Sequence, residues 1–201
     1  MGDTGAKEIE EKVLKLEELV ENADLDIGHS KKHLLLRAKN LAATLLDPYV
    51  LFHTRIVVSL VKKRGGDIID EITAWLHDIG RAVTGKGHRE VGAIWAGGWL
   101  KKFYITDDEI HRILDGIRNH GTRDRPETKT GKLLRLADAL AAFDPGWATM
   151  IVEYHRKWES SEKGEKELLK KRAVIEEMGT EEDKECVRKA LEVLGIKPSG
   201  K

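Results

Sequence analysis

Hydrophobic residues along the chain recur every three or four positions, which is the period of an α-helix with one buried face. Residues 7–22 show this clearly, with apolar side chains at Ile9, Val13, Leu16 and Val20. The same period runs through most of the chain, and no segment alternates apolar and polar residues as a half-buried strand does. The pattern therefore predicts an all-α protein.

Turn and capping residues divide this pattern into further helices. Asp47-Pro48 ends one helix and starts the next, because Asp accepts hydrogen bonds at an N-cap and Pro fits the first helical position. Gly65-Gly66 ends that helix, and Asp67 caps another. We expect helices over residues 30–46, 48–64, 67–76, 88–102, 106–119, 130–142, 147–159, 163–178 and 181–194.

The length of 201 residues suits one domain with some elaboration. We expect an N-terminal amphipathic helix in residues 1–25 and a central helical bundle in residues 26–144. A Pro-Gly break at residues 144–146 separates this bundle from residues 145–201, which we expect to form a C-terminal helical extension of the same domain.

Composition narrows the class of protein. Hydrophobic residues make up 40% and charged residues 35%, as is typical of a globular chain. The 35 basic side chains balance the 35 acidic ones, so no overall positive field indicates a nucleic-acid partner. Cys186 is the only cysteine, which favours a reducing compartment. With neither a signal peptide nor an apolar stretch long enough to span a bilayer, we expect a cytoplasmic protein without a membrane partner.

One set of polar residues stands out against this background. His77 and Asp78 lie side by side at the end of an apolar helix, before a glycine. Further along, His88 opens one helix, His120 closes another, and Asp138 lies in an otherwise apolar helix. A carboxylate among apolar side chains is costly to bury unless it is paired or bound to a metal. Because imidazole and carboxylate together suit a divalent ion that activates water, the set predicts a metal site.

The order of these residues resembles the HD superfamily of metal-dependent phosphohydrolases, whose pattern is His … His-Asp … Asp. The segments LHDIG, GHREVGA and ADAL carry the resemblance across the central bundle. It implies that this bundle is an HD metal-binding core, in which a first histidine, His77, Asp78 and Asp138 bind a metal. His88 and His120 are similar to the additional histidines of members that bind two metals.

The resemblance leaves the metal open among Mn, Fe, Co, Ni, Zn and Mg, and it allows one ion or two. With two ions, Asp78 would bridge them, and His88 and His120 would hold the second. The family implies hydrolysis of phosphomonoesters or phosphodiesters, often of nucleotides.

Two histidines compete for the place of the first ligand. Residues 26–33 resemble the family opening Asp-x-x-His-x-x-x-His, which indicates His33 as the ligand and His29 as a residue beside it. Against this, His53 and Val57 fit the His-x-x-x-Val pattern that family members show at this point.

Helix geometry favours His53. It lies roughly 17 Å of helix before the turn at Gly65, and His77 lies roughly 15 Å after that turn. Both histidines therefore reach the same end of a helical hairpin. Short-looped helices alternate in direction, which places His33 at the opposite end. We predict His53 as the first ligand, with His33 as the alternative.

Phosphate oxygens need cationic donors near the metal site. The nearest in sequence are Arg81, Lys86 and Arg118, although each also fits a solvated surface position. We predict Asp78, Arg81 and Lys86 as the catalytic residues of a site in which metal-activated water attacks phosphorus in line.

The sequence thus predicts a metal-dependent phosphohydrolase whose partner is a small phosphorylated substrate, such as a nucleotide. Whether it forms a homo-oligomer stays open. Two alternatives also stay open. One is a di-iron oxygenase of the HD type, because a minority of HD-like folds use a similar ligand set for that chemistry. The other is a non-catalytic HD module that binds a phosphorylated ligand.

Overall fold

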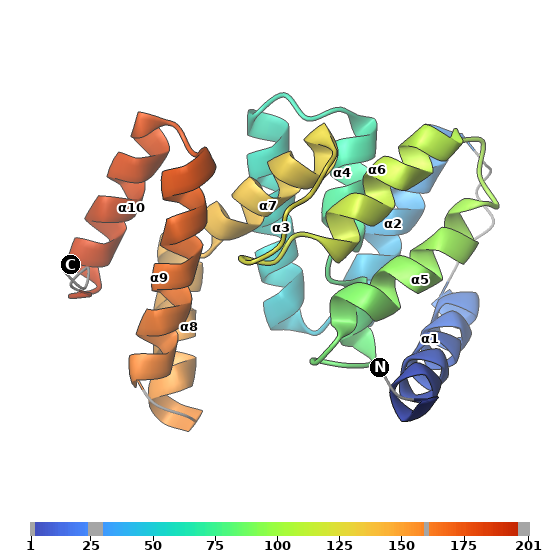
Figure 1. Ribbon diagram of the computed structural model, residues 1–201, viewed down its shortest axis with the longest axis horizontal. Helices are drawn as coiled ribbons and strands as arrows, with labels where there is room; N and C mark the ends of the chain where they lie inside the picture. Colours follow the sequence, from blue (N-terminus) through green and yellow to red (C-terminus); the bar gives the residue numbers. More distant parts are fainter. Residues whose placement is uncertain (1–2, 24–29, 159–160, 197–201) are drawn as a thin grey trace.

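A computed structural model describes residues 3–23, 30–158 and 161–196 of the chain. Within these ranges the chain forms ten α-helices, one short 3₁₀ helix and no strand (Figure 1). The all-α prediction is therefore confirmed. In chain order the elements are α1 (Asp3–Ala23), α2 (Lys31–Leu45), α3 (Pro48–Lys63), α4 (Ile68–Leu76), η1 (Ile79–Ala82), α5 (His88–Leu100), α6 (Asp107–Arg118), α7 (Lys129–Ala141), α8 (Pro145–Trp158), α9 (Ser161–Met178) and α10 (Glu181–Val193).

The hairpin of α3 and α4 forms where the capping residues predicted it. The Asp47 carboxylate accepts hydrogen bonds from the backbone N–H groups of Tyr49 and Val50, at 2.9 and 3.2 Å. Asp67 caps α4, and its own backbone N–H donates to Asp70 at 2.8 Å. Gly65 has a φ of 73°, which glycine adopts without strain, and it turns the chain between the two helices.

Several boundaries differ from the expected ones; for example, α5 ends at Leu100 and not at residue 102, and α9 begins at Ser161 and not at residue 163. Helix α8 begins at Pro145 and not at residue 147, because the Asp144 carboxylate accepts hydrogen bonds from the backbone N–H groups of Gly146 and Trp147. The segment after Asp78 forms the short helix η1, which the sequence did not predict as a separate element. The expected helix end at residue 159 lies outside the described residues.

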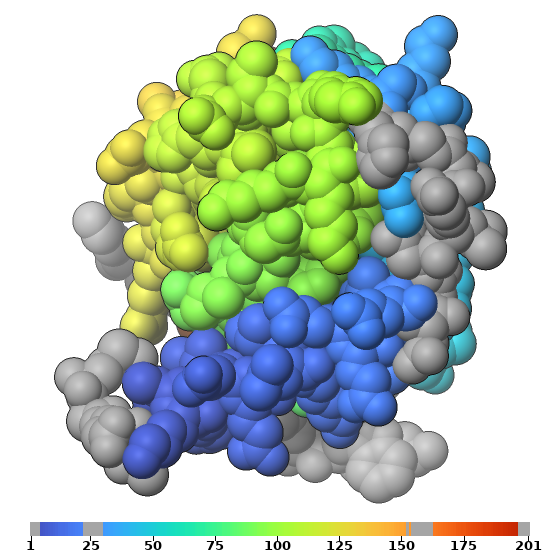
Figure 2. Space-filling model, turned by 90° about the vertical axis from the view of Figure 1, so that its right-hand side faces the viewer, coloured from blue at the N-terminus to red at the C-terminus, as the bar shows by residue number. Residues whose placement is uncertain are grey.

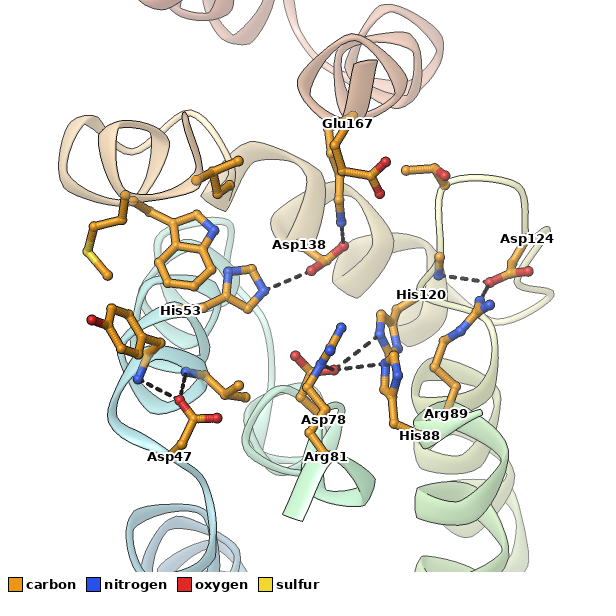
Figure 3. A pocket seen from close by; sticks show the side chains of 18 of the residues that line it. Asp47, His53, Asp78, Arg81, His88, Arg89, His120, Asp124, Asp138 and Glu167 are labelled. Atoms are coloured by element: carbon orange, nitrogen blue, oxygen red, sulfur yellow. Dashed lines mark hydrogen bonds and ion pairs between the residues drawn. The ribbon is translucent and has the colours of Figure 1, made fainter. Parts of the chain in front are cut away.

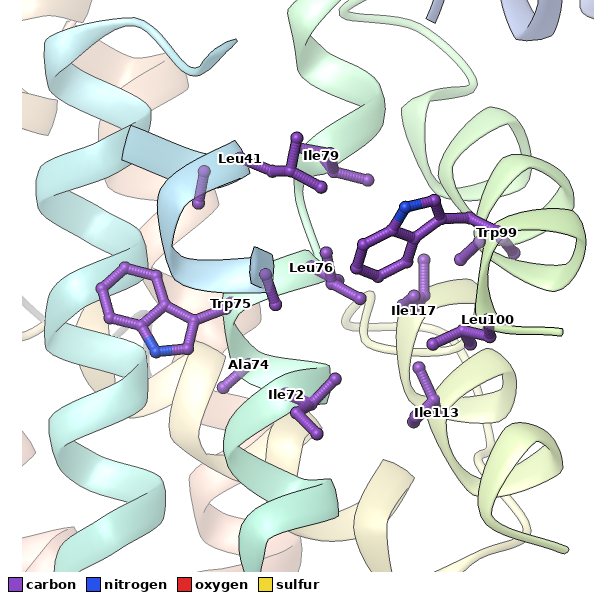
Figure 4. Packing of buried hydrophobic residues seen from close by; sticks show 14 of the residues in the cluster. Leu41, Ile72, Ala74, Trp75, Leu76, Ile79, Trp99, Leu100, Ile113 and Ile117 are labelled. Atoms are coloured by element: carbon purple, nitrogen blue, oxygen red, sulfur yellow. The ribbon is translucent and has the colours of Figure 1, made fainter. Parts of the chain in front are cut away.

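Helix α4 lies inside the bundle and packs against α2, α3, α6 and α7. It is apolar on nearly all sides, as expected for a buried helix. Leu76 is fully buried, with Ile113 and Ile117 of α6 and Leu100 of α5 in the same cluster (Figure 4). The end of α4, which carries His77 and Asp78, is therefore held in place by the core.

Helix α1 covers one side of this bundle, against α5 and α2 (Figure 2). Leu16 and Val20, on its predicted apolar face, are buried. Among the described helices, none has the length and apolar character that a bilayer span requires.

Of the C-terminal helices, α9 packs on α7, and α8 and α10 pack on α9. Leu134 and Ala137 of this helix belong to the main core, whereas Ala139 and Leu140 belong to a second apolar cluster shared with α9 and α10. Because α7 contributes to both clusters, we propose that residues 145–201 extend the same domain. Figure 1 shows α8 and α9 side by side on the far side of α7 from α5 and α6.

Candidate metal centre

Three buried histidines, His77, His88 and His120, are oriented by the same kind of local hydrogen bond. In each, Nδ1 lies 2.7–2.9 Å from the backbone carbonyl oxygen three residues earlier. A carbonyl oxygen only accepts, so Nδ1 carries the hydrogen, and in the neutral ring Nε2 keeps a free lone pair. Imidazoles fixed in this way are typical of metal ligands.

Asp78 lies among these three rings, and Figure 3 shows it beside His88 and His120. Its Oδ1 is 3.0 Å from Nε2 of His88 and 3.7 Å from Nε2 of His120, and its Oδ2 is 3.5 Å from Nε2 of His77. Helix α4 ends just before His77, and the turn into η1 brings the Asp78 side chain to the same place.

His53 and Asp138 lie on the other side of His77. Nε2 of His53 is 2.9 Å from Oδ1 of Asp138, and the ring centroids of His53 and His77 are 5.6 Å apart. The α3–α4 hairpin therefore brings His53 to His77, as the hairpin geometry predicted. His53 differs from the other three histidines, because its buried Nδ1 has no hydrogen-bond partner among the described residues.

We call His53, His77, Asp78, His88, His120 and Asp138 the metal-centre cluster. Among the described residues, two overlapping groups in it each have ligand atoms within 4.8 Å of one another: His53, His77 and Asp138, and His77, Asp78 and His120. Around an ion with bonds of about 2.1 Å, adjacent ligands lie about 3 Å apart and opposite ligands about 4.2 Å apart. The spacing in both groups is close enough to hold a metal ion.

Buried ligand atoms without a hydrogen bond indicate that the cluster fits a cation. Nε2 of His77, Nε2 of His88 and Oδ1 of Asp78 are buried and take part in no hydrogen bond among the described residues. His88 directs Nδ1 to a carbonyl oxygen, so in the neutral ring the close approach of Nε2 to Asp78 Oδ1 sets two lone pairs against each other. A cation bound between such atoms would remove the electrostatic repulsion between their lone pairs.

Burial, together with nearby His77, lowers the pKa of His120 to about 3. Burial likewise lowers the pKa of His77. Both imidazoles are therefore neutral at physiological pH, which is the state in which imidazole binds a metal.

The two carboxylates of the cluster are ionised. Burial alone would raise the pKa of Asp78, but His77 and Arg81 outweigh it and hold that pKa well below its usual range. For Asp138, burial is outweighed by Lys171 and His53, and its pKa is also held well below the usual range. Both side chains can therefore act as anionic ligands.

The predicted cationic residues have different surroundings. Arg81 lines the cavity beside the cluster, and its Nε lies 2.8 Å from Oδ1 of Asp78. Lys86 is exposed and does not line the cavity. Its charge lies toward α1, where the pKa of Glu8, lowered mainly by Lys12, is lowered further by Lys86. The structure thus does not bring Lys86 to the site, because the turn before α5 directs it toward α1.

Two further candidates lie away from the cluster. His33 is exposed at the start of α2, where its Nδ1 is 3.1 Å from the hydroxyl of Ser30. Arg118 is half exposed and donates to Glu90 at 3.0 and 3.4 Å. His29 lies outside the described residues.

The members of the cluster other than His77 form one wall of a cavity of about 970 Å³. The starts of α3 and α5, the loop at residues 121–124, and helices α8 and α9 complete it. Sequence reasoning missed the residues from α8 and α9. Trp147 lies against His53, with ring centroids 5.1 Å apart, and Lys171 pairs with Asp138. Lys171 stands in a highly charged stretch in which no local pattern distinguishes it.

No protein-family model matches the chain, and no curated protein matches it at a significant level. Among solved structures, the chain is similar to a crystal structure described as a predicted HD superfamily hydrolase from an uncultured Thermotogales bacterium. The two chains are 22% identical and have a TM-score of 0.56 over 82% of this chain and 86% of that chain. The chain therefore has the HD-domain fold that its motifs predicted.

Proposed function

We propose that this protein is a metal-dependent phosphohydrolase that acts on a nucleotide or another small phosphoester. The observation that carries the proposal is a buried group of four histidines, of which His77 and His120 are neutral, and two ionised aspartates, with ligand atoms that lack a hydrogen bond, beside a cavity. The HD-domain fold supports it, because the solved structure with this fold is described as a predicted hydrolase.

In this proposal the whole metal-centre cluster holds the ions. The first ion is assigned to His53, His77, Asp78 and Asp138. A second ion is assigned to His88 and His120, with Asp78 shared between the two. The donor set of imidazole and carboxylate groups is compatible with Mn, Fe, Co, Ni, Zn or Mg.

A bound divalent ion would supply a water of lowered pKa and offset charge on phosphate oxygens. The chain's own residues would bind and orient the substrate. Arg81 presents a guanidinium beside Asp78, where it can donate to a phosphate oxygen. The cavity has the volume of a small-molecule site, and Tyr49 and Trp147 give it aromatic surfaces against which a base could pack.

The test is a panel of the six divalent metals against nucleotides and sugar phosphates, with released phosphate as the readout. We expect metal-dependent release that a chelator abolishes. Absence of release with every metal and substrate would contradict the proposal. Two bound irons with an oxygen-dependent product would instead identify an oxygenase. Tight binding of phosphorylated ligands without turnover would identify a non-catalytic module.

A further inference from the structure

Lys171, in the C-terminal helix α9, reaches the metal-centre cluster. Its ammonium forms an ion pair with Oδ2 of Asp138, and its side chain lines the cavity while remaining 19% exposed. The other oxygen of the carboxylate, Oδ1, faces His53. Asp138 thus directs one oxygen toward the metal-ligating histidines and the other toward a cation from outside the HD core.

Arg81 stands in the same relation to Asp78. Each carboxylate of the cluster is paired with one cation, so two negative and two positive charges cancel. Figure 3 shows Arg81 beside Asp78 and, on the other side of the cavity, Glu167 of α9 beyond Asp138. A divalent ion added to this balanced site leaves an excess of positive charge, which favours an anionic ligand between the two cations.

The other basic side chains that line the cavity do not contact the cluster. Arg89 pairs with Asp124, on the loop that follows His120. Arg123 is exposed on the same loop and has no ion pair with the cluster among the described residues. Arg81 and Lys171 are therefore the cations placed where a phosphate at the cluster would lie.

We propose that Lys171 binds the phosphate group of the substrate together with Arg81, so that α9 completes the active site. This inference rests on the proposed phosphohydrolase function. An ammonium has three N–H donors, and the pair with Asp138 leaves donors that can turn toward phosphate oxygens. The flexible stem of lysine allows this movement without a shift of the helix.

The experiment measures two affinities by calorimetry: that of Mn²⁺ for the metal-free protein, and that of inorganic phosphate for the Mn²⁺-loaded protein. Lys171→Met removes the charge and keeps the apolar stem, whereas Lys171→Arg keeps the charge. Lys170→Met is the matched control, because Lys170 lies in the same turn of α9 and pairs with Glu167 instead of the cluster. Thermal melts followed by circular dichroism check that each variant is folded.

We expect Lys171→Met to weaken phosphate binding by about tenfold or more, the effect of a charge-assisted hydrogen bond. Mn²⁺ should bind this variant at least as tightly as the wild type, because a positive charge next to Asp138 has been removed. Lys171→Arg should restore phosphate binding in part, and Lys170→Met should leave both affinities within about twofold of wild type.

Three results would overturn the inference, and they are distinguishable. If phosphate affinity is unchanged in Lys171→Met, Lys171 does not bind phosphate. If Mn²⁺ and phosphate affinities fall together, Lys171 only holds Asp138 in place. If the wild type binds no Mn²⁺ and shows no metal-dependent hydrolysis, the proposed function itself fails, and the inference fails with it.

Discussion

Two clusters of buried polar side chains lie along α4 and α7, one near the starts of these helices and the other near their ends. The metal-centre cluster lies near the ends. The other, which we call the hydrogen-bonded network, consists of the buried Asp70, Asp115 and Thr130 and the partly exposed Arg112 and Thr128. Both are built around buried aspartates, yet they differ in how the carboxylates are satisfied.

Within the network, Asp70 accepts hydrogen bonds from protein donors on both oxygens. The hydroxyl of Thr130 donates to Oδ1 at 2.6 Å, Arg112 donates to the same oxygen at 3.2 Å, and the backbone N–H of Asp67 donates to Oδ2 at 2.8 Å. Arg112 also donates to Thr130 at 2.8 Å. These contacts join α4, α6 and α7.

Asp115 is satisfied in the same way. Its Oδ2 accepts from the backbone N–H and the hydroxyl of Thr128, at 2.9 and 2.6 Å, and its Oδ1 accepts from the side chain of Asn119 at 2.8 Å. Gly131 leaves room for this carboxylate, because a Cβ there would lie 2.5 Å from Oδ2.

The comparison separates a structural role from a functional one. Asp115 and Asp78 are 6% and 4% exposed, so burial does not distinguish them. Their partners do. Among the described residues, every buried side-chain N or O atom of the network has a hydrogen-bond partner, whereas Asp78, His77 and His88 each keep a buried atom without one, although Oδ1 of Asp78 forms an ion pair with Arg81. Satisfied buried polar groups stabilise a fold, and unsatisfied ones indicate a missing ligand.

The largest expected effect comes from Asp78→Ala. This variant should lose metal-dependent hydrolysis to background and bind Mn²⁺ at least about 100-fold more weakly, because Asp78 is assigned to both ions. Its metal-free stability should change by less than about 1 kcal/mol, since Arg81, its cationic partner, is partly exposed. Phosphate-release assays, calorimetry and urea unfolding measure the three quantities. Retained metal and full rate would rule out the assignment.

Asp115→Ala should show the opposite pattern. Removing this carboxylate leaves the partly buried donors of Thr128 and Asn119 unpaired, and it should lower the free energy of unfolding by about 3 kcal/mol. Urea unfolding in a chelator measures the loss, and Mn²⁺ affinity of the folded fraction should stay at the wild-type value. If Asp115→Ala is as stable as Asp78→Ala, the distinction between the two clusters is wrong.

A smaller effect should appear in acid, in the metal-free protein. The unfolded chain protonates His120 near its ordinary pKa of 6.5, whereas in the folded state burial lowers this pKa to about 3. The stability that neutral His120 contributes is therefore fully present above pH 6.5 and is lost as the pH falls toward 3. Between pH 7 and pH 5, the wild type should lose about 2 kcal/mol more stability than His120→Gln.

Asp115→Asn is the matched control for this measurement. Burial would raise the pKa of Asp115, but the Thr128 hydroxyl and Asn119 outweigh it and lower that pKa in the folded state. The stability from ionised Asp115 is therefore present above its ordinary pKa and is lost only in stronger acid. The gap between wild type and Asp115→Asn should stay constant from pH 7 to pH 5. A constant gap for His120→Gln as well would contradict the lowered pKa of His120.

The smallest effect is expected for Lys86→Ala. Lys86 is exposed and lies outside the cavity lining, so kcat/KM should stay within about twofold of wild type. Arg81→Ala, which removes a cation beside Asp78, should lower kcat/KM by about tenfold or more. Steady-state kinetics with the substrate identified in the metal panel measure kcat/KM for both variants. A loss in Lys86→Ala equal to that in Arg81→Ala would restore Lys86 as a catalytic residue.

Much of the fold and part of the site follow from short stretches of sequence. Helical periodicity and the caps at Asp47 and Asp67 depend on neighbours within a few residues, so the α3–α4 hairpin could be predicted. The hairpin in turn placed His53 near His77. Both predictions succeed because a short turn leaves two helices few ways to pack.

The roles of individual charged residues could not be predicted from short stretches of sequence. Asp115 and Asp138 both stand in helices among apolar residues, and only the neighbouring elements make one a network member and the other part of the metal-centre cluster. Lys86 is close to His88 in sequence but lies toward α1, while Lys171 is 33 residues from Asp138 and pairs with it.

The periodicity, the caps and the order of the His and Asp residues therefore established the helices, the HD-domain fold and most of the candidate ligands. The packing of α9 on α7 established which lysine reaches the site, and the partners of each buried carboxylate established which aspartates have a structural role. The physical reason is that an apolar stripe shows that a helix has a buried face, but it does not show which helix covers that face.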